Sequence, residues 1–272
     1  MNKLLIISGP TATGKTKFAA HLARRFDGEL ISADSRQVYR GMDLTTGKDR
    51  VDVPTWGYDV VDPDEEFSVS HWVKLAKRAI SDIQSRNKLP IVVGGTGLYI
   101  KALLEPLQTI NIPPNKKLRK KLQKLLVNAL QKMISRGDMN DSDWNNPRRL
   151  IRKIEVLNFK RGPLAKQQGV PLSNYDSLII GLTAPIAKLD ARIDERMMAR
   201  KAAGIEEEIV ALRSKYRANL PAMSAINLNE HAYARRQLTW FKKQKDIHWF
   251  DITKEGWMAR VEKLVDAWYT TK

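Results

Sequence analysis

The sequence contains no cysteine and no long apolar run, and each absence excludes a class of protein. Without cysteine the chain has no disulfide, no thiolate metal site and no cysteine nucleophile, which agrees with a reducing compartment. No apolar stretch approaches the roughly 20 residues of a membrane-spanning helix. A predicted strand begins within the first residues, so we expect no signal or transit peptide. We therefore expect a cytoplasmic protein with no membrane partner.

Acidic residues are few relative to basic ones. The 272 residues include 30 Asp and Glu against 47 Lys and Arg, which gives a net charge of +17. Such an excess favours a polyanionic partner, because each phosphate that is neutralised releases counterions. The alternative is a generally basic, solvated surface, but a kinase for a small metabolite would not need this charge. The four His residues show no metal-ligand spacing.

The segment Gly9-Pro10-Thr11-Ala12-Thr13-Gly14-Lys15-Thr16 matches G-x-x-x-x-G-K-[ST], the phosphate-binding loop. Its context agrees, since an apolar run at 4–7 predicts a strand and residues 17–25 have helical spacing. Lys15 is expected to reach the outer phosphates, and the Thr16 hydroxyl is expected to bind Mg²⁺. The alternative is a strand-to-helix turn without a ligand. The motif indicates a diphosphate or polyphosphate but not its identity.

Two further polar loops follow predicted strands of the same sheet. Asp34 follows the strand at 29–32, and Gly94-Gly95-Thr96-Gly97 follows the strand at 90–93. In an open parallel sheet, ligands lie beyond the carboxyl ends of the strands. Asp34 is therefore either a helix cap, a carboxylate in the ligand cleft, or both. The glycine loop alone is weak evidence and could be only a tight turn.

The remaining elements predict an α/β fold. Apolar runs indicate two more strands, and helical periodicity indicates six further helices. The strands are 178–183 and 247–250, and the helices are 68–86, 115–136, one from 147, 186–203 with Gly204 as a C-cap, one from 229, and 255–268. Composition shifts at Asn111, and the Gly/Pro/Gln-rich stretch 161–174 is predicted to be a mobile loop. We expect a core of residues 1–110 and 176–272, interrupted by a helical insertion at 111–175.

Five blocks in this order resemble the tRNA dimethylallyltransferase (tRNA isopentenyltransferase) family. They are GPTATGKT at 9–16, ISADSRQVYRGMD at 31–43, VVGGTGLYIKALLEPL at 92–107, NPRRLIRKIEV at 146–156 and YARRQLTWFKK at 233–243. The resemblance implies a parallel sheet flanked by helices, like the P-loop NTPases, with a small helical insertion that holds the anticodon stem-loop. It also implies transfer of a dimethylallyl group from dimethylallyl diphosphate to the exocyclic amine of the tRNA adenosine just 3′ of the anticodon, with release of diphosphate.

The resemblance also implies roles for particular residues, alongside tRNA and dimethylallyl diphosphate as partners and Mg²⁺ as cofactor. Asp34 matches the general base, and Lys15 and Thr16 complete the catalytic set. The diphosphate site corresponds to Gly9, Pro10, Thr11, Ala12, Thr13, Gly14, Lys15, Thr16 and Arg196. Positions that contact tRNA correspond to Asp34, Ser35, Arg36, Gln37, Thr96, Arg119, Arg148, Arg149, Leu150, Ile151, Arg152, Arg235, Arg236 and Gln237. We expect a monomer.

The sequence departs from the family in its short insertion and in the segment 220–226, which lacks an aromatic-containing glycine motif. These departures concern the tRNA contacts more than the chemistry. One alternative is a small-metabolite or nucleoside kinase that binds ATP at the same loop, with Arg192, Arg196 and Arg200 in an arginine-rich lid. Another is a non-catalytic RNA-binding protein, against which the intact Lys15, Thr16 and Asp34 argue.

Overall fold

The computed structural model describes residues 2–105, 107, 109–160, 175–216, 222 and 229–271. The chain divides into two compact units, one formed by Met1–Glu105 with Ser173–Lys272 and the other by Pro106–Leu172. The sheet lies in the first unit, and the described residues of the second form short helices. No helix in the described ranges is long and apolar enough to cross a membrane.

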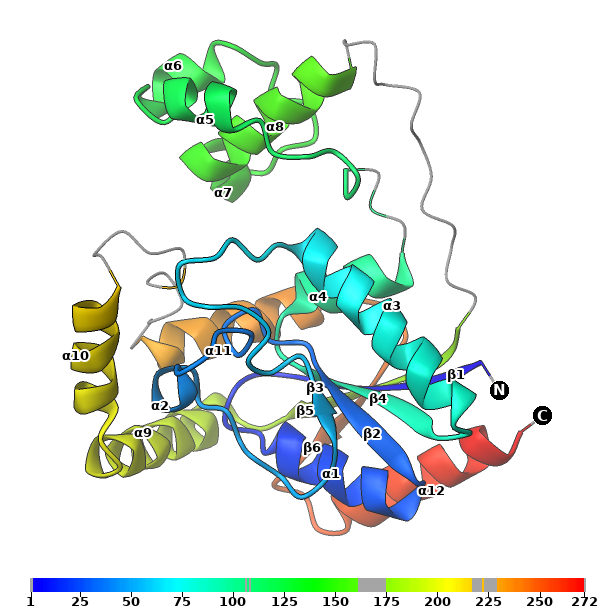
Figure 1. The fold of residues 1–272 in the computed structure, drawn as a ribbon. Helices are drawn as coiled ribbons and strands as arrows, with labels where there is room; N and C mark the ends of the chain where they lie inside the picture. The colour runs from blue at the N-terminus through cyan, green and yellow to red at the C-terminus, as the bar shows by residue number, and fades with distance from the viewer. Residues whose placement is uncertain are drawn as a thin grey trace. The chain divides into compact units, whose positions relative to one another are not determined.

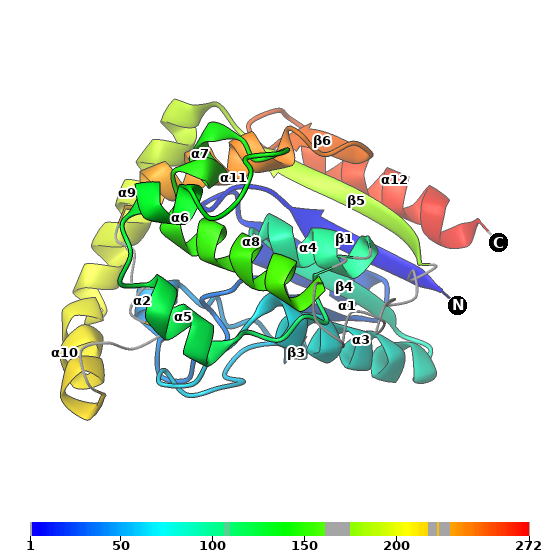
Figure 2. The ribbon, with the colours of Figure 1, turned by 90° about the horizontal axis from the view of Figure 1, so that it is seen from above.

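The first unit is built on six parallel strands in the order β3-β2-β4-β1-β5-β6 (Figure 2). The strands are β1 Lys3–Ser8, β2 Gly28–Ser32, β3 Thr55–Trp56, β4 Leu89–Gly94, β5 Asp176–Thr183 and β6 Ile247–Asp251. All six residues of β1 are buried, as is typical of a parallel strand covered on both faces. The α/β prediction is thus confirmed. The two-residue strand β3 was not predicted, because it is too short to show a pattern.

Helices cover both faces of this sheet (Figure 1). The helices of this unit are α1 Lys15–Arg25, α2 Asp43–Thr46, α3 Val69–Ser85, α4 Gly97–Leu104, α9 Ile186–Ala202, α10 Ile205–Lys215, α11 Glu230–Phe241 and α12 Trp257–Thr270. Helices α1 and α12 lie on one face and α3 on the other (Figure 1). Leu5 and Ile7 of β1 share one core with Phe18 of α1 and Val261 of α12. Because side chains alternate along a strand, the neighbouring residues of β1 point to the other face, where α3 packs.

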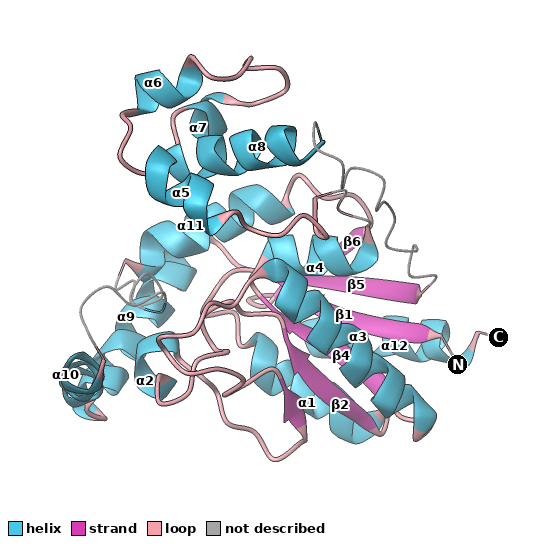
Figure 3. Ribbon diagram, turned by 45° about the horizontal axis from the view of Figure 1, so that its top comes forward, coloured by secondary structure: helices cyan, strands magenta, loops and turns pink. Residues whose placement is uncertain are grey.

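The carboxyl ends of the strands meet at the edge of the sheet where α2, α9 and α11 lie (Figure 3). The loops after β1, β2 and β4 are therefore brought to one place, as the sequence predicted. The C-cap of α9 is Ala203, and the left-handed Gly204, with a φ of 95°, follows it. The helix therefore ends next to Gly204, one residue before the predicted cap. The chain re-enters a helix directly after it, and this helix, α10, was missed because its short apolar pattern continues that of α9.

The second unit contains α5 Lys116–Leu122, α6 Val127–Gln131, α7 Asp141–Trp144 and α8 Pro147–Lys160. The prediction of one helix over 115–136 is wrong, since the chain leaves the helix after Leu122 and is extended at Leu126. The break leaves Leu126 76% exposed. It buries Leu122 and Leu130, which are 3% and 0% exposed, in one cluster with α8. Packing of two short helices against α8 therefore outweighs the continuity of the helical pattern.

Pro147 occupies the first turn of α8, as predicted, and the side chain of Asn146 accepts a hydrogen bond from the backbone N–H of Arg148 at 3.0 Å. This is the N-cap contact that a helix opened by proline requires. The predicted loop at 161–174 lies outside the described residues. So does the segment 220–226, apart from Ala222.

Candidate active site

The phosphate-binding loop joins β1 to α1 and has the curled backbone that its glycines permit. Gly9 has a φ of 136°, and a Cβ there would lie 2.2 Å from the carbonyl oxygen of Leu182. Gly14 has a φ of 79°, and the Thr13 hydroxyl donates to the Pro10 carbonyl at 3.0 Å. The loop ends at Lys15, the first residue of α1. The N–H groups at this end are those that a helix leaves unpaired, so the geometry favours an anion.

Lys15 lies in this loop with its Nζ 2.5 Å from the Pro10 carbonyl oxygen. Removal of water from around the ammonium, together with the charge of Arg196, lowers the pKa of Lys15 from 10.5 to about 8. The carboxylates of Asp34 and Asp49 act in the opposite direction. A bound anion would supply the negative charge that Lys15 lacks here, so the site is arranged to bind one.

Arg196 reaches the phosphate loop from α9, as predicted. Its Nη1 donates to the Thr11 hydroxyl at 3.2 Å, and its Nη2 donates to the Gly47 carbonyl at 2.8 Å. One turn further along α9, Arg200 forms an ion pair with Glu230 at 2.5 Å, and both side chains are only 7% exposed. Arg200 is thereby neutralised within the protein, whereas Arg196 is held mainly by neutral oxygen atoms.

Asp34 follows β2, and its Oδ1 accepts a hydrogen bond from the backbone N–H of Arg36 at 2.9 Å. It therefore closes its own turn and lines the ligand cavity. No helix begins in the described residues around it, since α2 starts only at Asp43, so the helix-cap interpretation is wrong and the carboxylate lies in the cleft. The loop after β4 lies beside it, since the Thr96 hydroxyl accepts a hydrogen bond from the backbone N–H of Ser35 at 3.0 Å. Gln37, from the same turn, donates to the Gly47 carbonyl at 3.0 Å.

Gln237 of α11 connects the phosphate loop to the loop after β4. Its side-chain oxygen accepts from the backbone N–H of Thr11 at 2.8 Å, and its amide donates to the Gly95 carbonyl at 3.1 Å. A Cβ at position 95 would lie 2.0 Å from the Gln237 amide nitrogen, which explains the glycine there. The three polar loops are thus joined through side chains.

These groups surround one cavity of about 420 Å³ within the first unit. Lys15 and Asp34 both line it, as do Thr16, Arg196 and the ring of Tyr233. Other residues around it are Thr11, Ala12, Gly14, Lys17, Arg36, Gln37, Thr46, Gly47, Asp49, Tyr58, Val93, Gly94, Gly95, Arg192, Glu195, Ala199, Arg200, Glu230 and Gln237. The cavity therefore combines an anion-binding end with a carboxylate.

Tyr233 was not predicted as a site residue, although it begins the last of the five blocks. The Arg36 guanidinium lies 3.9 Å from the centroid of its ring, and Arg236 lies 5.8 Å from it. Burial raises the pKa of Tyr233, so its hydroxyl stays protonated. Gly47 and Tyr58 were missed as well, because no local pattern marks a residue that enters a cavity from a loop.

The arginines predicted to contact tRNA in the second unit differ in their surroundings. Arg119 forms two hydrogen bonds with the buried Glu155, at 2.7 and 2.9 Å, and Arg152 donates to the carbonyls of Thr109 and Ile112. Arg149 is paired with Asp143. The exposed guanidinium of Arg148 has no hydrogen bond or ion pair within the described ranges.

Leu150 and Ile151, also predicted at the tRNA surface, are buried in the cluster between α8 and the neighbouring helices. Their side chains shape the second unit and are not available to touch RNA, so we remove them from the contact set. On α11, Arg235 forms an ion pair with Asp190 at 2.7 Å and does not line the cavity, unlike Gln237 two residues later.

The oxygen donors around the cavity decide whether the expected Mg²⁺ fits the site. The described part of the chain contains no cluster of three or more His, Asp or Glu side chains able to hold a metal. The cavity does bring together the Thr16 hydroxyl, Asp34 and Asp49. Mg²⁺ binds through few protein ligands when phosphate oxygens and water complete its shell. The residues therefore fit an ion that arrives with a diphosphate, and not a metal site built by the protein alone.

A parallel α/β sheet with a phosphate loop after its central strand defines a protein of the P-loop class. The pattern of the family described as IPP transferase matches residues 37–232, and that of the family described as isopentenyl transferase matches residues 2–52. The chain belongs to the IPP transferase family.

Curated relatives agree with this assignment. The tRNA dimethylallyltransferase of Roseiflexus castenholzii is 38% identical, over 97% of this chain and 98% of the relative. The tRNA dimethylallyltransferase of Geobacillus thermodenitrificans is 35% identical, over 96% of this chain and 95% of the relative. Among solved structures, the tRNA isopentenylpyrophosphate transferase of Bacillus halodurans is 31% identical, with a TM-score of 0.72 over 98% of this chain and 97% of that one.

Proposed function

We propose that this protein transfers a dimethylallyl group from dimethylallyl diphosphate to the exocyclic amine of the tRNA adenosine just 3′ of the anticodon. The observation that carries the proposal is the shared cavity, lined by Lys15 and Arg196 at the phosphate loop and by the carboxylate of Asp34. The family membership and the names of the relatives agree with it. The kinase alternative leaves the net charge of +17 unexplained.

In the reaction, the bond between the allylic carbon and the diphosphate oxygen breaks, and its electron pair goes to the diphosphate. Negative charge therefore grows on the leaving group. Lys15, Arg196 and the N–H groups at the start of α1 are placed to stabilise it, because each presents a donor or a positive charge at the phosphate loop.

The new bond joins the amine nitrogen of adenosine to the allylic carbon, and the nitrogen then loses a proton. Asp34 is the proposed acceptor of that proton. Its Oδ1 is held by the backbone N–H of Arg36, while the described residues supply no hydrogen bond to its Oδ2. The held oxygen fixes the orientation of the carboxylate, and the other oxygen is available to the amine.

The adenosine must leave the stacked anticodon loop to reach Asp34, because a base that is still stacked cannot enter a cavity lined by the protein. The tRNA backbone is the proposed partner of the basic groups, among which Arg148 is exposed and has no side-chain partner among the residues that the structure describes. We propose the cytoplasm as the compartment, where such a substrate is found. We keep a monomer as the expectation, since the cavity is formed within one unit of one chain.

Mg²⁺ stays a proposed cofactor. Thr16 would hold it through the side-chain hydroxyl, with the remaining ligands from the diphosphate and water. A bound Mg²⁺ neutralises part of the charge on the diphosphate and so makes it a better leaving group. Lys15 and Arg196, which line the same cavity, would bind the diphosphate beside such an ion.

The test is incubation of the protein with unmodified tRNA, Mg²⁺ and radiolabelled dimethylallyl diphosphate. We expect label in the RNA, at the adenosine 3′ of the anticodon, and none with the Asp34→Asn variant. Consumption of ATP without any label in RNA would favour the kinase. Binding of tRNA with neither reaction would leave only an RNA-binding role.

A further inference from the structure

The short helix α2 has no N-cap of its own. The residue before it is Met42, whose side chain makes no capping hydrogen bond. The first N–H groups of a helix lack partners inside the helix, and they usually receive them from a capping side chain. In this protein the partner comes from α10, more than 160 residues away in sequence.

That partner is the carboxylate of Glu208. One of its oxygens accepts from the backbone N–H groups of Asp43 and Leu44, at 3.0 and 2.8 Å. The other accepts from the backbone N–H and the hydroxyl of Thr45, at 2.8 and 2.7 Å. Four hydrogen bonds to one ionised group make this the main polar connection between α2 and α10. Glu208 itself does not line the cavity.

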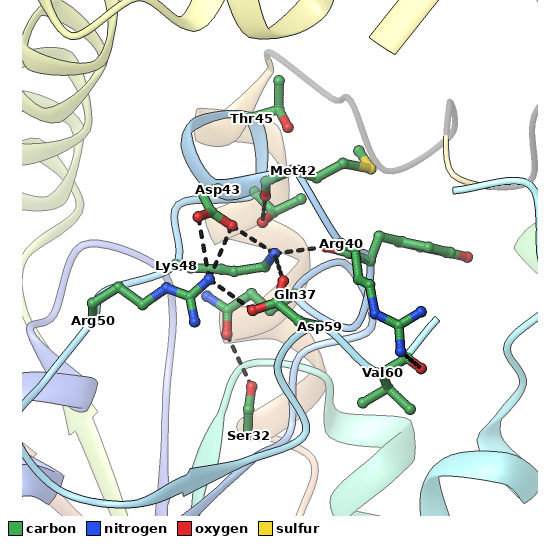
Figure 4. A network of polar contacts seen from close by, with 12 residues as sticks. Ser32, Gln37, Arg40, Met42, Asp43, Thr45, Lys48, Arg50, Asp59 and Val60 are labelled. Atoms are coloured by element: carbon green, nitrogen blue, oxygen red, sulfur yellow. Dashed lines mark hydrogen bonds and ion pairs between the residues drawn. The ribbon is translucent and has the colours of Figure 1, made fainter. Parts of the chain in front are cut away.

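A buried lysine holds the other end of the same turn (Figure 4). The side chain of Lys48 is fully buried, and its ammonium donates to the Tyr39 carbonyl at 2.6 Å and to Asp43 and Asp59, each at 2.7 Å. Arg50 donates to both of these carboxylates as well. Burial alone would raise the pKa of Asp43, but Lys48 and Arg50 outweigh it and lower that pKa.

Gly47 lies between these two ends and faces the active-site cavity. Its carbonyl oxygen accepts from Gln37 at 3.0 Å and from the Nη2 of Arg196 at 2.8 Å. The Nη1 of the same guanidinium reaches the Thr11 hydroxyl in the phosphate loop. The Asp49 carboxylate lies farther from Nη2, at 3.8 Å. The nearest group that orients this end of Arg196 is therefore a carbonyl oxygen whose position depends on α2.

We propose that Glu208 is a positioning residue for the diphosphate-binding arginine. It fixes α2, α2 fixes the Gly47 carbonyl, and that carbonyl aims Arg196 at the phosphate loop. This inference rests on the proposed function, since Arg196 is taken to bind the leaving diphosphate. Glu208 lies outside the cavity, yet its loss should weaken binding of dimethylallyl diphosphate and leave binding of tRNA unchanged.

The test compares Glu208→Gln with Glu207→Gln, a change at the neighbouring exposed residue of the same helix. Glutamine keeps one acceptor oxygen but turns an NH₂ group toward N–H donors, so about half of the contacts are lost. We expect kcat/KM for dimethylallyl diphosphate and affinity for inorganic diphosphate to fall about 10-fold, the scale of a lost charged hydrogen bond. The tRNA affinity should stay within about 2-fold of wild type, as should all constants of Glu207→Gln.

A double-mutant cycle with Arg196→Ala separates positioning from a general structural role. If Glu208 acts through Arg196, Glu208→Gln should add less than about 2-fold once that arginine is absent. An undiminished 10-fold loss in the Arg196→Ala background would overturn the proposal, as would equal losses of diphosphate and tRNA binding. Should Glu208→Gln fold poorly, Thr45→Val removes one of the four bonds and should give a smaller loss of the same kind.

Label transfer tests the proposed function, and affinity for inorganic diphosphate tests the role of Glu208. Absence of label transfer by the wild-type protein would refute the prenyl transfer itself. The cycle measured on affinity for inorganic diphosphate would still decide whether Glu208 acts through Arg196.

Discussion

The side-chain oxygen of Gln237 accepts a hydrogen bond from the backbone N–H of Thr11, with 2.8 Å between the two atoms. This contact places the amide of an α11 residue against the phosphate loop. The variant Gln237→Glu keeps an acceptor there but removes the donor to the Gly95 carbonyl and adds a negative charge beside the anion site. We expect affinity for inorganic diphosphate to fall about 10-fold or more, because like charges in a partly buried site repel strongly.

Calorimetric titration with diphosphate measures this effect. Gln244→Glu is the matched control, since the Gln244 side chain donates to the Trp240 carbonyl, has no other hydrogen bond within the described part of the chain and does not line the cavity. Equal losses in the two variants would show that a general charge effect, and not the contact with Thr11, is responsible.

Asp34→Asn tests the proposed general base with little disturbance of the turn. Asparagine keeps the oxygen that accepts the Arg36 N–H, but it cannot take a proton from the amine. We expect transfer to fall by at least about 100-fold, the lower end of general-base contributions, with tRNA binding nearly unchanged. Single-turnover kinetics measures the rate of transfer, and filter binding on the same protein measures the affinity for tRNA. Parallel losses of both would remove Asp34 from the role of base.

The lowered pKa of Lys15 predicts a pH dependence of diphosphate binding. In the free protein Lys15 loses its charge as the pH rises through about 8, and a bound diphosphate raises this pKa again toward 10.5. Binding should therefore take up protons in this window, and affinity should weaken as pH rises through it. Below this pH window Lys15 is charged in both the free and the diphosphate-bound protein, so it contributes nothing to the dependence of affinity on pH.

Calorimetry in buffers of different ionisation enthalpy counts these protons. The variant Lys15→Met reports the titration of the diphosphate itself, so the prediction concerns the difference between wild type and variant. Identical proton uptake in the two proteins would mean that Lys15 does not titrate on binding.

Arg148 and Arg149 offer a paired test of the tRNA surface, since they are adjacent and both exposed. Arg149 is engaged with Asp143, whereas Arg148 has no such partner among the described residues. We expect Arg148→Ala to weaken tRNA binding and to flatten the slope of log K against log salt by about 0.7 to 1. Arg149→Ala should change the slope less. An unaltered slope for Arg148→Ala would show that this guanidinium does not meet a phosphate.

Much of the site could be predicted from local sequence because its parts follow strands. The phosphate loop, Asp34 and Thr96 each come directly after a strand of one parallel sheet, so topology alone brings them to one edge. The role of Arg196 came from the resemblance to the family, and the structure places that arginine beside Thr11.

The remainder depends on contacts that no local pattern encodes. Glu208 resembles any surface carboxylate of an amphipathic helix until α2 is seen to lack a cap. Leu150 and Ile151 share a block with three arginines, yet they face the core of the second unit. The break after Leu122 follows from what the two short helices cover, which the helical spacing of 115–136 does not reveal.

The hydrogen bond from the Ser35 N–H to the Thr96 hydroxyl joins the turn that carries Asp34 to the glycine loop after β4. A second contact, from the Thr96 N–H to the Ala33 carbonyl at 3.0 Å, reinforces it. The two loops therefore behave mechanically as one body. In evolution they are free to diverge only together, and an engineer who wishes to admit a different nucleotide has to redesign both at once.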